Sequence, residues 1–384
     1  MASSHAELLS PPLASSQALR VVETDPSTDA RWAAFVLNHP DGSIYHHPAW
    51  LQALEREYSQ KGVYLACEDA HGKFSGVLPL VYTRGLPFGL GKPLTGRRLS
   101  SLPRTPLAGP LSTNSRATAT LLQEAVCRVR NSPGLELQIK MQDCELDHPD
   151  IGLVCTPWRL SYRLQLPANS ETPFRIKSSH SRASIKWAVN KATKHGVCAR
   201  PAETESELKV WYSLYLQTMR TNFVPPRPYR FFKALWELLR EKGMMQLLLA
   251  EEQGSARRNI IAGSVFLKFG QTVSYAFNGS CLDNLSLRPN DLIQWHAINE
   301  ACKNGYRYFD FGEVPQHRHD LAKFKSKWGS DAIQLYRYYY PAPGARVGVE
   351  LDGHHRSISL AQALWRRLPL AATSWFGDQM YSYL

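Results

Sequence analysis

An ordered series of periodic segments fills residues 203–341, and this order restricts the possible folds more than any other feature of the sequence. Two helical patterns come first, "ETESELKVWYSLYLQTMR" and "YRFFKALWELLREKG", with the breaker "VPPRP" between them. Three strand-like runs with turns between them, "MQLLLAEE", "IIAGSVFLKFG" and "TVSYAFNGS", predict an antiparallel meander. A helix in "NDLIQWHAINEACKNG", capped by Asn290, then leads to the strand "YRYFDFG", a short basic helix and the strand "AIQLYRYYYP".

The first half of the chain repeats this order less clearly. It has the strand "LRVVET", helices within 28–38 and 48–58, the strands "VYLACE" and "FSGVLPLVY", a helix over 116–130 and the strand "LELQIKM". We therefore predict an α/β (α+β) chain with two tandem domains, residues 19–168 and 169–345, each a mixed, largely antiparallel sheet flanked by helices. Residues 1–18 are predicted to form a flexible tail, and residues 346–384 an amphipathic extension interrupted by Pro369.

Composition and charge exclude some classes of function. The chain has 384 residues, 43% of them hydrophobic, which is typical of a globular protein, and no apolar run reaches the about 20 residues needed to span a bilayer. The seven cysteines are scattered without a C-x-x-C pair, which argues against a zinc site or a disulfide framework and favours a reducing compartment. The first 18 residues lack the pattern of a signal peptide, so we expect a cytoplasmic location, including the inner face of the membrane. The net charge of +12 favours anionic partners such as nucleic acid, phosphorylated metabolites or a membrane face.

Several motifs in sequence order resemble one protein family. They are "IYHHPAWLQAL", "SIKWAVNKATKHGV", "TMRTNFVPPRPYRFF", "NGSCLDNLSLRPNDLIQWHAINEACKNGYRYFDFG" and "KFKSKWG", and they span roughly residues 20 to 345. Together they resemble the FemAB-like (Fem-type) peptidyltransferases and their relatives with BioF2-like acetyltransferase domains, which belong to the GNAT superfamily of acyl-CoA N-acyltransferases. The resemblance implies two tandem GNAT-like domains. It also implies transfer of an aminoacyl group from aminoacyl-tRNA, or of an acyl group from another activated donor, to an amine of a nucleotide-linked or lipid-linked cell-wall precursor, without a cofactor or a metal.

The stretch "YRYFDFGEVPQHRHDLAKFKSKWG" carries the catalytic candidates. Acyl transfer to nitrogen needs a proton acceptor for the amine and positive charge beside the tetrahedral oxyanion. The resemblance matches Lys325 with the family lysine that stabilises the oxyanion or the phosphate region of the donor, and Phe324 and Trp328 would fix its stem and exclude water. The alternative without a catalytic role is a basic segment exposed to solvent, which we expect for Lys323 and Lys327.

Asp310 and Glu313 are the candidates for accepting the amine proton, because both lie at the end of the predicted strand. Strand alternation places Asp310 on one face and Phe309 and Phe311 on the other. Which carboxylate points into the site stays open. Either carboxylate can instead simply pair with Arg307 or Arg318.

Other residues are candidates for substrate binding. Arg182 and Lys186 belong to a basic helix stripe that either holds phosphates or is a solvated face. Arg104 is the only charge in "SLPRTPLAGPLS", a loop that the resemblance places beside the acceptor cleft. Tyr275 and Asn278 end the third strand of the meander, where this fold admits its donor. His46 and His47 are expected to pack at a helix entry.

Two alternatives remain at the level of sequence. The first is an acyl-CoA-dependent N-acyltransferase of polysaccharide or cell-envelope biosynthesis. Against it, "SLSLRPNDLIQW" has no glycine for a pyrophosphate-binding turn, and Pro289 removes one amide donor. The second is a non-catalytic RNA-binding or membrane-docking module, supported by the net charge and by the C-terminal "WRRLPL".

Overall fold

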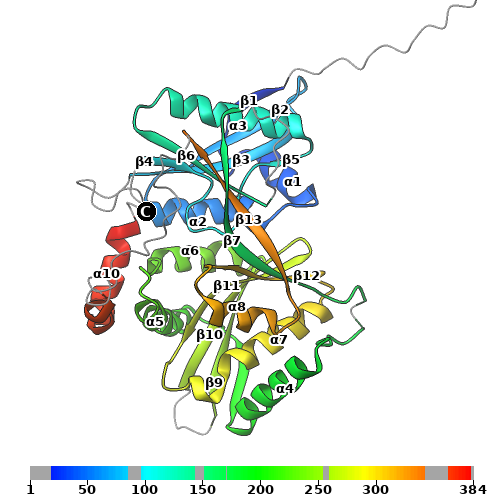
Figure 1. The fold of residues 1–384 in the computed structure, drawn as a ribbon, viewed down its shortest axis with the longest axis vertical. Coiled ribbons are helices and arrows are strands. Elements are labelled where there is room, and N and C mark those ends of the chain that lie inside the picture. The colour runs from blue at the N-terminus through cyan, green and yellow to red at the C-terminus, as the bar shows by residue number, and fades with distance from the viewer. Residues whose placement is uncertain are drawn as a thin grey trace, which may run out of the picture.

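The computed structural model describes residues 19–84, 97–142, 151–169, 171–253, 259–341 and 362–381. The predicted tail 1–18 and residues 346–361 and 382–384 of the predicted extension lie outside these ranges. Within them helices and strands are distributed along the whole chain (Figure 1).

The first half contains the elements that the sequence predicts and two short additional strands, β4 and β5. Its elements are β1 (Arg20–Glu23), α1 (Ala30–Asn38), the 3-10 turn η1 (Ile44–His46), α2 (Pro48–Tyr58), β2 (Val63–Glu68), β3 (Phe74–Thr83), β4 (Arg97–Ser100), β5 (Leu111–Ser112), α3 (Ser115–Arg130) and β6 (Leu135–Met141).

The second half begins with a long strand, β7, that the sequence analysis missed. Its elements are β7 (Val154–Gln165), α4 (Ser179–Lys194), β8 (Val197–Pro201), α5 (Glu205–Thr221), α6 (Tyr229–Leu239), β9 (Met245–Glu252), β10 (Asn259–Phe269), β11 (Thr272–Ser280), η4 (Leu285–Leu287), α7 (Pro289–Lys303), β12 (Tyr308–Val314), α8 (His319–Ser326) and β13 (Asp331–Tyr340). The C-terminal helix α10 (Leu370–Tyr381) begins directly after Pro369.

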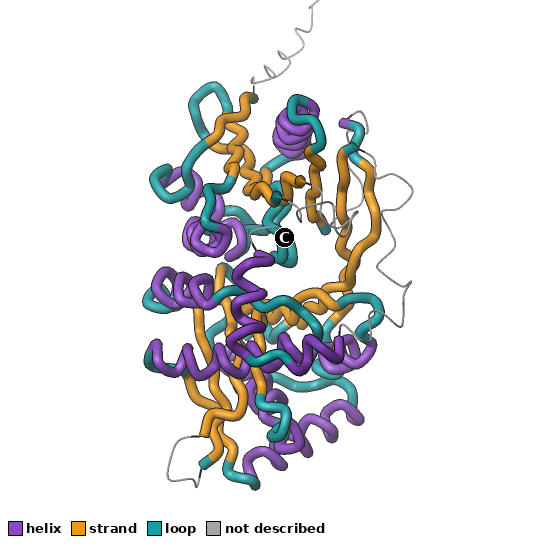
Figure 2. Tube along the Cα trace, turned by 90° about the vertical axis from the view of Figure 1, so that its left-hand side faces the viewer, coloured by secondary structure: helices purple, strands orange, loops and turns teal. Residues whose placement is uncertain are grey.

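One continuous sheet runs through both halves in the order β1-β2-β3-β4-β6-β13-β7-β12-β11-β10-β9-β8, with β5 beside β3. The last strand, β13, inserts between β6 and β7, where Tyr336–Tyr340 pair with β6. Figure 1 shows β7 and β13 crossing from the upper half to the lower, and Figure 2 shows two long strands linking the halves along one side. The domain boundary between residues 168 and 169 stays a prediction, because β13 pairs with strands of both halves.

Buried helix faces join the two halves. Helices α2 and α6 share one hydrophobic core, in which the rings of Trp50 and Phe231 meet edge to face with centroids 5.4 Å apart. This geometry is favourable for aromatic pairs beyond the area that they bury. The two halves are thus held by core packing as well as by the sheet.

The predicted cap of α7 is wrong. The helix starts at Pro289, and Arg288 precedes it in the left-handed conformation with φ 64°. Asn290 lies inside the first turn and accepts a hydrogen bond from the Ser280 hydroxyl over 2.9 Å. Proline at the first helical position needs no amide partner, which favours a start one residue earlier.

Candidate active site

The sheet opens between β11 and β12. These strands run parallel and pair over three residues only, ending at Ser274 opposite Asp310. Beyond that point β11 continues to pair with β10, and β12 with β7. The paired edges therefore diverge and leave a gap in the sheet, which begins at Asp310.

A β-bulge in β12 brings both candidate carboxylates to one face. The pairing with β7 matches Asp310 with Arg163 and Glu313 with Ser161, and skips Phe311. Partners directly across a ladder point to the same face, and residues two apart on one strand do so as well. Without the extra residue, Asp310 and Glu313 would point to opposite faces. Sequence alternation is right for Asp310 against Phe309 and Phe311, both of which are buried in the core.

Hydrogen bonds fix the two carboxylates differently. Asp310 accepts from the Gly312 amide over 2.8 Å and from the Ser161 hydroxyl over 3.4 Å. Glu313 forms an ion pair with Arg159 over 2.7 Å. No ion pair to Asp310 occurs among the residues that the structure describes. Asp310 therefore has no direct ion-pair partner in the described part of the chain, although its charge acts on the nearby Lys325 ammonium. The predicted pairings with Arg307 or Arg318 do not form there, and Glu313 pairs with Arg159 instead.

Lys325 is buried against the bulge. Lys325 is 5% exposed. Its ammonium donates hydrogen bonds to the backbone carbonyls of Phe311, Gly312 (3.0 Å) and Glu313 (3.1 Å). Burial lowers the pKa of Lys325 to about 8, against the charges of Asp310 and Glu313, which raise it. An ammonium has three N–H donors, and three carbonyls engage them, so the geometry supports Lys325 as a clamp on the bulge. Its predicted contact with an oxyanion stays a prediction and requires one of these bonds to be exchanged.

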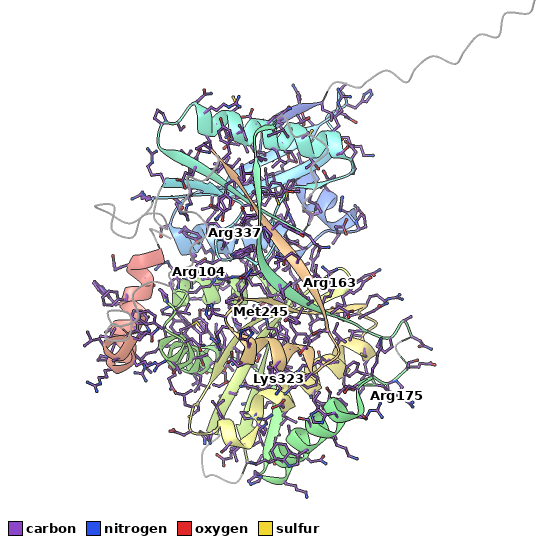
Figure 3. All side chains as sticks on the ribbon, viewed as in Figure 1. Arg104, Arg163, Arg175, Met245, Lys323 and Arg337 are labelled. Atoms are coloured by element: carbon purple, nitrogen blue, oxygen red, sulfur yellow. The ribbon has the colours of Figure 1, made fainter. Side chains whose placement is uncertain are left out.

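The residues around Lys325 differ in their surroundings. Trp328 is fully buried and stacks on Phe311 with centroids 6.4 Å apart, and its role in shielding Lys325 from water stays a prediction. Lys323, which Figure 3 labels, belongs to α8 and is exposed. Lys327 is not a freely solvated lysine, because its ammonium binds the buried Asp291 and lies 4.4 Å from the ring centroid of Phe324.

Tyr45 completes this site from the first half of the chain. It is 6% exposed, and its hydroxyl hydrogen bonds the Ser274 side chain. Burial raises the pKa of Tyr45, and the charges of Asp310 and then Glu313 add to the effect. Tyr45 lies in the motif "IYHHPAW", but its own segment carries no sign that it belongs to the site.

Substituting Gly312 should test the bulge. Its φ is +72°, and a Cβ there would lie 3.9 Å from the Tyr275 carbonyl oxygen, so space is available and the backbone conformation alone opposes a side chain. We expect Gly312→Ala to lower the free energy of unfolding by about 1–2 kcal/mol and to lower turnover, because the carboxylates shift. Gly243→Ala is the matched control, since Gly243 has φ +67° with open space around it and lies in the turn before β9. Equal turnover of the two variants would contradict a role for the bulge.

A chain of hydrogen bonds crosses from β10 to α7 through the predicted donor residues. Ser264 donates to Asn278, Asn278 donates to Ser280, and Ser280 donates to Asn290, over 3.0, 3.1 and 2.9 Å. Burial raises the pKa of Tyr275, whose hydroxyl also bonds Ser264. Asn278 and Tyr275 therefore share one polar network beside the gap in the sheet.

The start of α7 carries a negative charge. Asp291 lies in the first turn and pairs with Arg288 over 3.0 Å and with Lys327. A carboxylate there satisfies the positive end of the helix dipole and competes with an anionic ligand. This end of α7 is thus poorly suited to a pyrophosphate, in agreement with the sequence.

The remaining basic candidates lie apart from the carboxylates. Arg182 donates to the carbonyl of Ile176 over 2.8 Å and so fixes the entry to α4, while Lys186 is exposed. Arg104 donates to the Pro225 carbonyl over 2.9 Å at the joint between the halves. Their roles in substrate binding stay predictions.

The two histidines of "YHHPAW" pack at a helix entry as predicted. His46 is buried and its ring bridges Ser43 and the Gly109 carbonyl over 2.8 and 2.9 Å. His47 caps α2 by accepting from the Ala49 amide. Burial lowers the pKa of both rings to about 4.

Three observations limit other interpretations of the described part of the chain. No group of histidine, cysteine and acidic side chains there is placed to hold a metal ion. No helix there is both long and apolar enough to cross a membrane. A pocket of about 660 Å³ lies in the first half beside α1, and none of the predicted site residues lines it.

Comparisons with known proteins agree with the fold. Residues 179–325 match the family model of the acetyltransferase (GNAT) domain. The structure resembles FemX with a TM-score of 0.61 and 14% identity, covering 83% of this chain and 96% of that one. It also resembles the C-terminal domain of a putative lysylphosphatidylglycerol synthetase from Agrobacterium fabrum (TM-score 0.56, 14% identity, 87% and 95% covered) and L-PGS from Bacillus licheniformis (0.54, 12%, 92% and 99%). No curated protein matches the sequence. Residues 179–325 therefore match the acetyltransferase (GNAT) domain family, the chain as a whole has the fold of such proteins, and both findings support acyl transfer as its activity.

Proposed function

We propose that the chain transfers an aminoacyl group from aminoacyl-tRNA to an amine of a cell-envelope precursor in the cytoplasm or at the inner face of the membrane. The motif resemblance favours this donor and acceptor. The observation that carries the proposal is the pair Asp310 and Glu313 on one face at the opening of the sheet, with Tyr45 against them. Such a site supplies a base for an attacking amine and needs no covalent nucleophile.

The start of α7 supports aminoacyl-tRNA over acyl-CoA as the donor. Acyl-CoA enzymes of this fold bind the pyrophosphate at the amides that begin this helix. Here Pro289 lacks an amide N–H and Asp291 places a carboxylate beside the remaining amides. Both features weaken a pyrophosphate site.

In the proposed reaction, Asp310 takes the proton of the attacking amine. The amine nitrogen attacks the ester carbonyl, the new amide bond forms, and the ester oxygen leaves with a proton. Asp310 suits the role because it begins the opening and has no cation paired to it among the residues described. Glu313 is held by Arg159 and serves to orient the site.

Replacing each carboxylate by the corresponding amide should separate the roles of Asp310 and Glu313. We expect Asp310→Asn to lower kcat on the order of 10²- to 10⁴-fold, the usual contribution of a general base, and Glu313→Gln to lower it less. Steady-state rates of amide formation measure both variants. If Glu313→Gln loses more turnover than Asp310→Asn, the assignment of the base is reversed.

A direct assay tests the function as a whole. Purified protein is incubated with charged tRNA or with acetyl-CoA, each with amine acceptors extracted from the cell envelope, and the products are identified by mass spectrometry. Transfer from charged tRNA supports the proposal. Transfer from acetyl-CoA alone establishes the acyl-CoA alternative, which the name of the matching family favours.

The C-terminal residues 362–381 supply a candidate for peripheral membrane contact. Leu364 and Trp375 are 61% and 58% exposed, and Arg366 and Arg367, which follow Leu364 in the sequence, are exposed as well. Exposed apolar side chains beside arginines suit the surface of an anionic bilayer. This contact would bring the enzyme to a lipid-linked acceptor.

A further inference from the structure

Two cations face each other across the β6–β13 ladder. Lys140 on β6 lies directly opposite Arg337 on β13. Side chains opposite each other in a ladder point to the same face, and like charges in this position are destabilising. Lys140 is only 2% exposed, so water screens the repulsion poorly.

A third cation joins the pair around one indole ring. The guanidinium carbons of Arg337 and Arg159 lie 3.6 and 4.7 Å from the ring centroid of Trp158, and the Lys140 ammonium lies 5.4 Å away. The face of an aromatic ring attracts one cation by about 0.5–2 kcal/mol. One ring cannot neutralise three cations.

The carboxylates near this cluster are too few to neutralise its positive charge. Glu313 pairs with Arg159, whereas no carboxylate of the described residues lies within 4.0 Å of Lys140 or Arg337. Burial, followed by the charge of Arg337, lowers the pKa of Lys140 to about 7, and burial also lowers the pKa of Arg337.

Hydrogen-bond donors of the cluster are also unused. The Nε atoms of Arg159 and Arg337 are buried and have no partner within the described ranges. One oxygen of Glu313, Oε2, is likewise buried without a partner, so the cluster contains an acceptor as well as donors. Buried N–H donors without an acceptor are rare in proteins, unless a ligand or water accepts their hydrogen bonds.

A purely structural role explains only part of the cluster. The Lys140 ammonium donates to the carbonyls of Leu102 and Thr105, so it anchors the loop that follows β4. Arg337 does not anchor another segment in this way, because its polar contact is with the side chain of Tyr339 on its own strand. Figure 3 places Arg337 at the crossing of β7 and β13, between the halves.

We propose that Lys140, Arg159 and Arg337 form an anion site that binds a phosphate or carboxylate group through the guanidinium N–H donors above Trp158. An oxyanion there would offset the repulsion across the ladder and accept from the two free Nε donors. Because Arg159 also holds Glu313, the bound anion lies next to the proposed catalytic face. This identification rests on the proposed function: the anion is a charged group of the amine acceptor.

Anion binding tests the site without any transfer reaction. The probes are inorganic phosphate, pyrophosphate and succinate, measured by calorimetry on the full chain at constant ionic strength. The variant Arg337→Gln should lose about tenfold or more in affinity, the value of a charge-assisted hydrogen bond. Preference for pyrophosphate or for succinate identifies the phosphate or the carboxylate source.

Arg130→Gln is the matched control. Arg130 also stacks on a ring, with its guanidinium 5.3 Å from the centroid of Tyr340, and donates to that hydroxyl over 2.7 Å, but it lies on α3 away from the cluster. It should bind the probes like the unmodified protein. Without a probe, Arg337→Gln should melt at or above the temperature of the unmodified protein, because the repulsion is gone.

The outcomes separate this site from the proposed function. Equal affinity of Arg337→Gln and the unmodified protein for every probe overturns the anion site, even if transfer from charged tRNA occurs. Loss of anion binding in Arg337→Gln supports the site even if the transfer assay fails, and then the proposed function alone falls. A clear loss of melting temperature in Arg337→Gln without a probe indicates a structural arginine and also overturns the site.

Discussion

Lys325→Met should lower turnover on the order of a hundredfold to a thousandfold and lower the free energy of unfolding at neutral pH by about 1–3 kcal/mol. The methionine fills a similar volume but leaves the carbonyls of Phe311, Gly312 and Glu313 without their buried donor. The bulge that aligns Asp310 with Glu313 then loses its clamp. Steady-state kinetics and chemical denaturation measure the two effects.

The pH dependence of stability gives an independent check of the buried ammonium. Burial lowers the pKa of Lys325 in the folded protein to about 8, whereas an unfolded lysine has a pKa of about 10.4. Between these values the unfolded chain holds more protons, so this group makes the protein more stable as pH rises, by about 1.4 kcal/mol per pH unit. Below pH 8 the lysine is charged in both states and contributes no slope. Lys325→Met should remove this part of the slope.

The control for Lys325 is Lys323. Lys323 is exposed on the same helix, so Lys323→Met should leave turnover and stability almost unchanged. Lys327 is unsuitable, because its substitution leaves the buried Asp291 with Arg288 as its partner. If Lys323→Met and Lys325→Met reduce activity equally, α8 is a basic docking surface and the clamp has no catalytic importance.

Local patterns in the sequence predicted most of the fold, and its non-local features escaped them. The helices α5 and α6 have clear helical periodicity, because each buries one face in a core. The strands β9 and β10 are continuous apolar runs, because their two faces lie in two different cores. Strand β7 was missed because only three of its twelve residues are buried and Pro157 interrupts its pattern. Its pairing with β12 and β13 involves partners about 150 residues or more away, which no local window contains.

The site was predicted in part for the same reason. The motif resemblance selected Lys325, and the position of Asp310 and Glu313 at the end of a predicted strand selected these two carboxylates. The structure brings all three to one bulge. That Asp310 and Glu313 share a face depends on the extra residue Phe311, which strand alternation cannot predict. Tyr45 and Lys140 join the site only through the packing of the two halves, so their own segments carry no sign of it.

Glu57→Ala should lower the free energy of unfolding by about 3–5 kcal/mol, the usual cost of removing one partner of a buried ion pair. Glu57 on α2 pairs with Arg227 before α6 over 2.7 Å, and the two side chains are 0% and 3% exposed. Arg227 also donates to the Arg104 carbonyl over 2.6 Å and lies 4.4 Å from the ring centroid of Phe231. Since burial raises the pKa of Glu57 to about 7, measurements at pH 8 keep it ionised.

The same two helices offer a matched control for this ion pair. Arg56 on α2 and Glu237 on α6 also pair, over 2.6 Å, but both side chains are nearly half exposed. Glu237→Ala should therefore lower the free energy of unfolding by only about 0–1 kcal/mol.

The double variant Glu57→Met with Arg227→Met should recover much of the stability that Glu57→Ala loses, because no unpaired charge remains buried. If the double variant is as unstable as Glu57→Ala, the loss comes from packing between the halves. If Glu57→Ala and Glu237→Ala cost the same, water reaches the buried pair and the joint between α2 and α6 opens in solution.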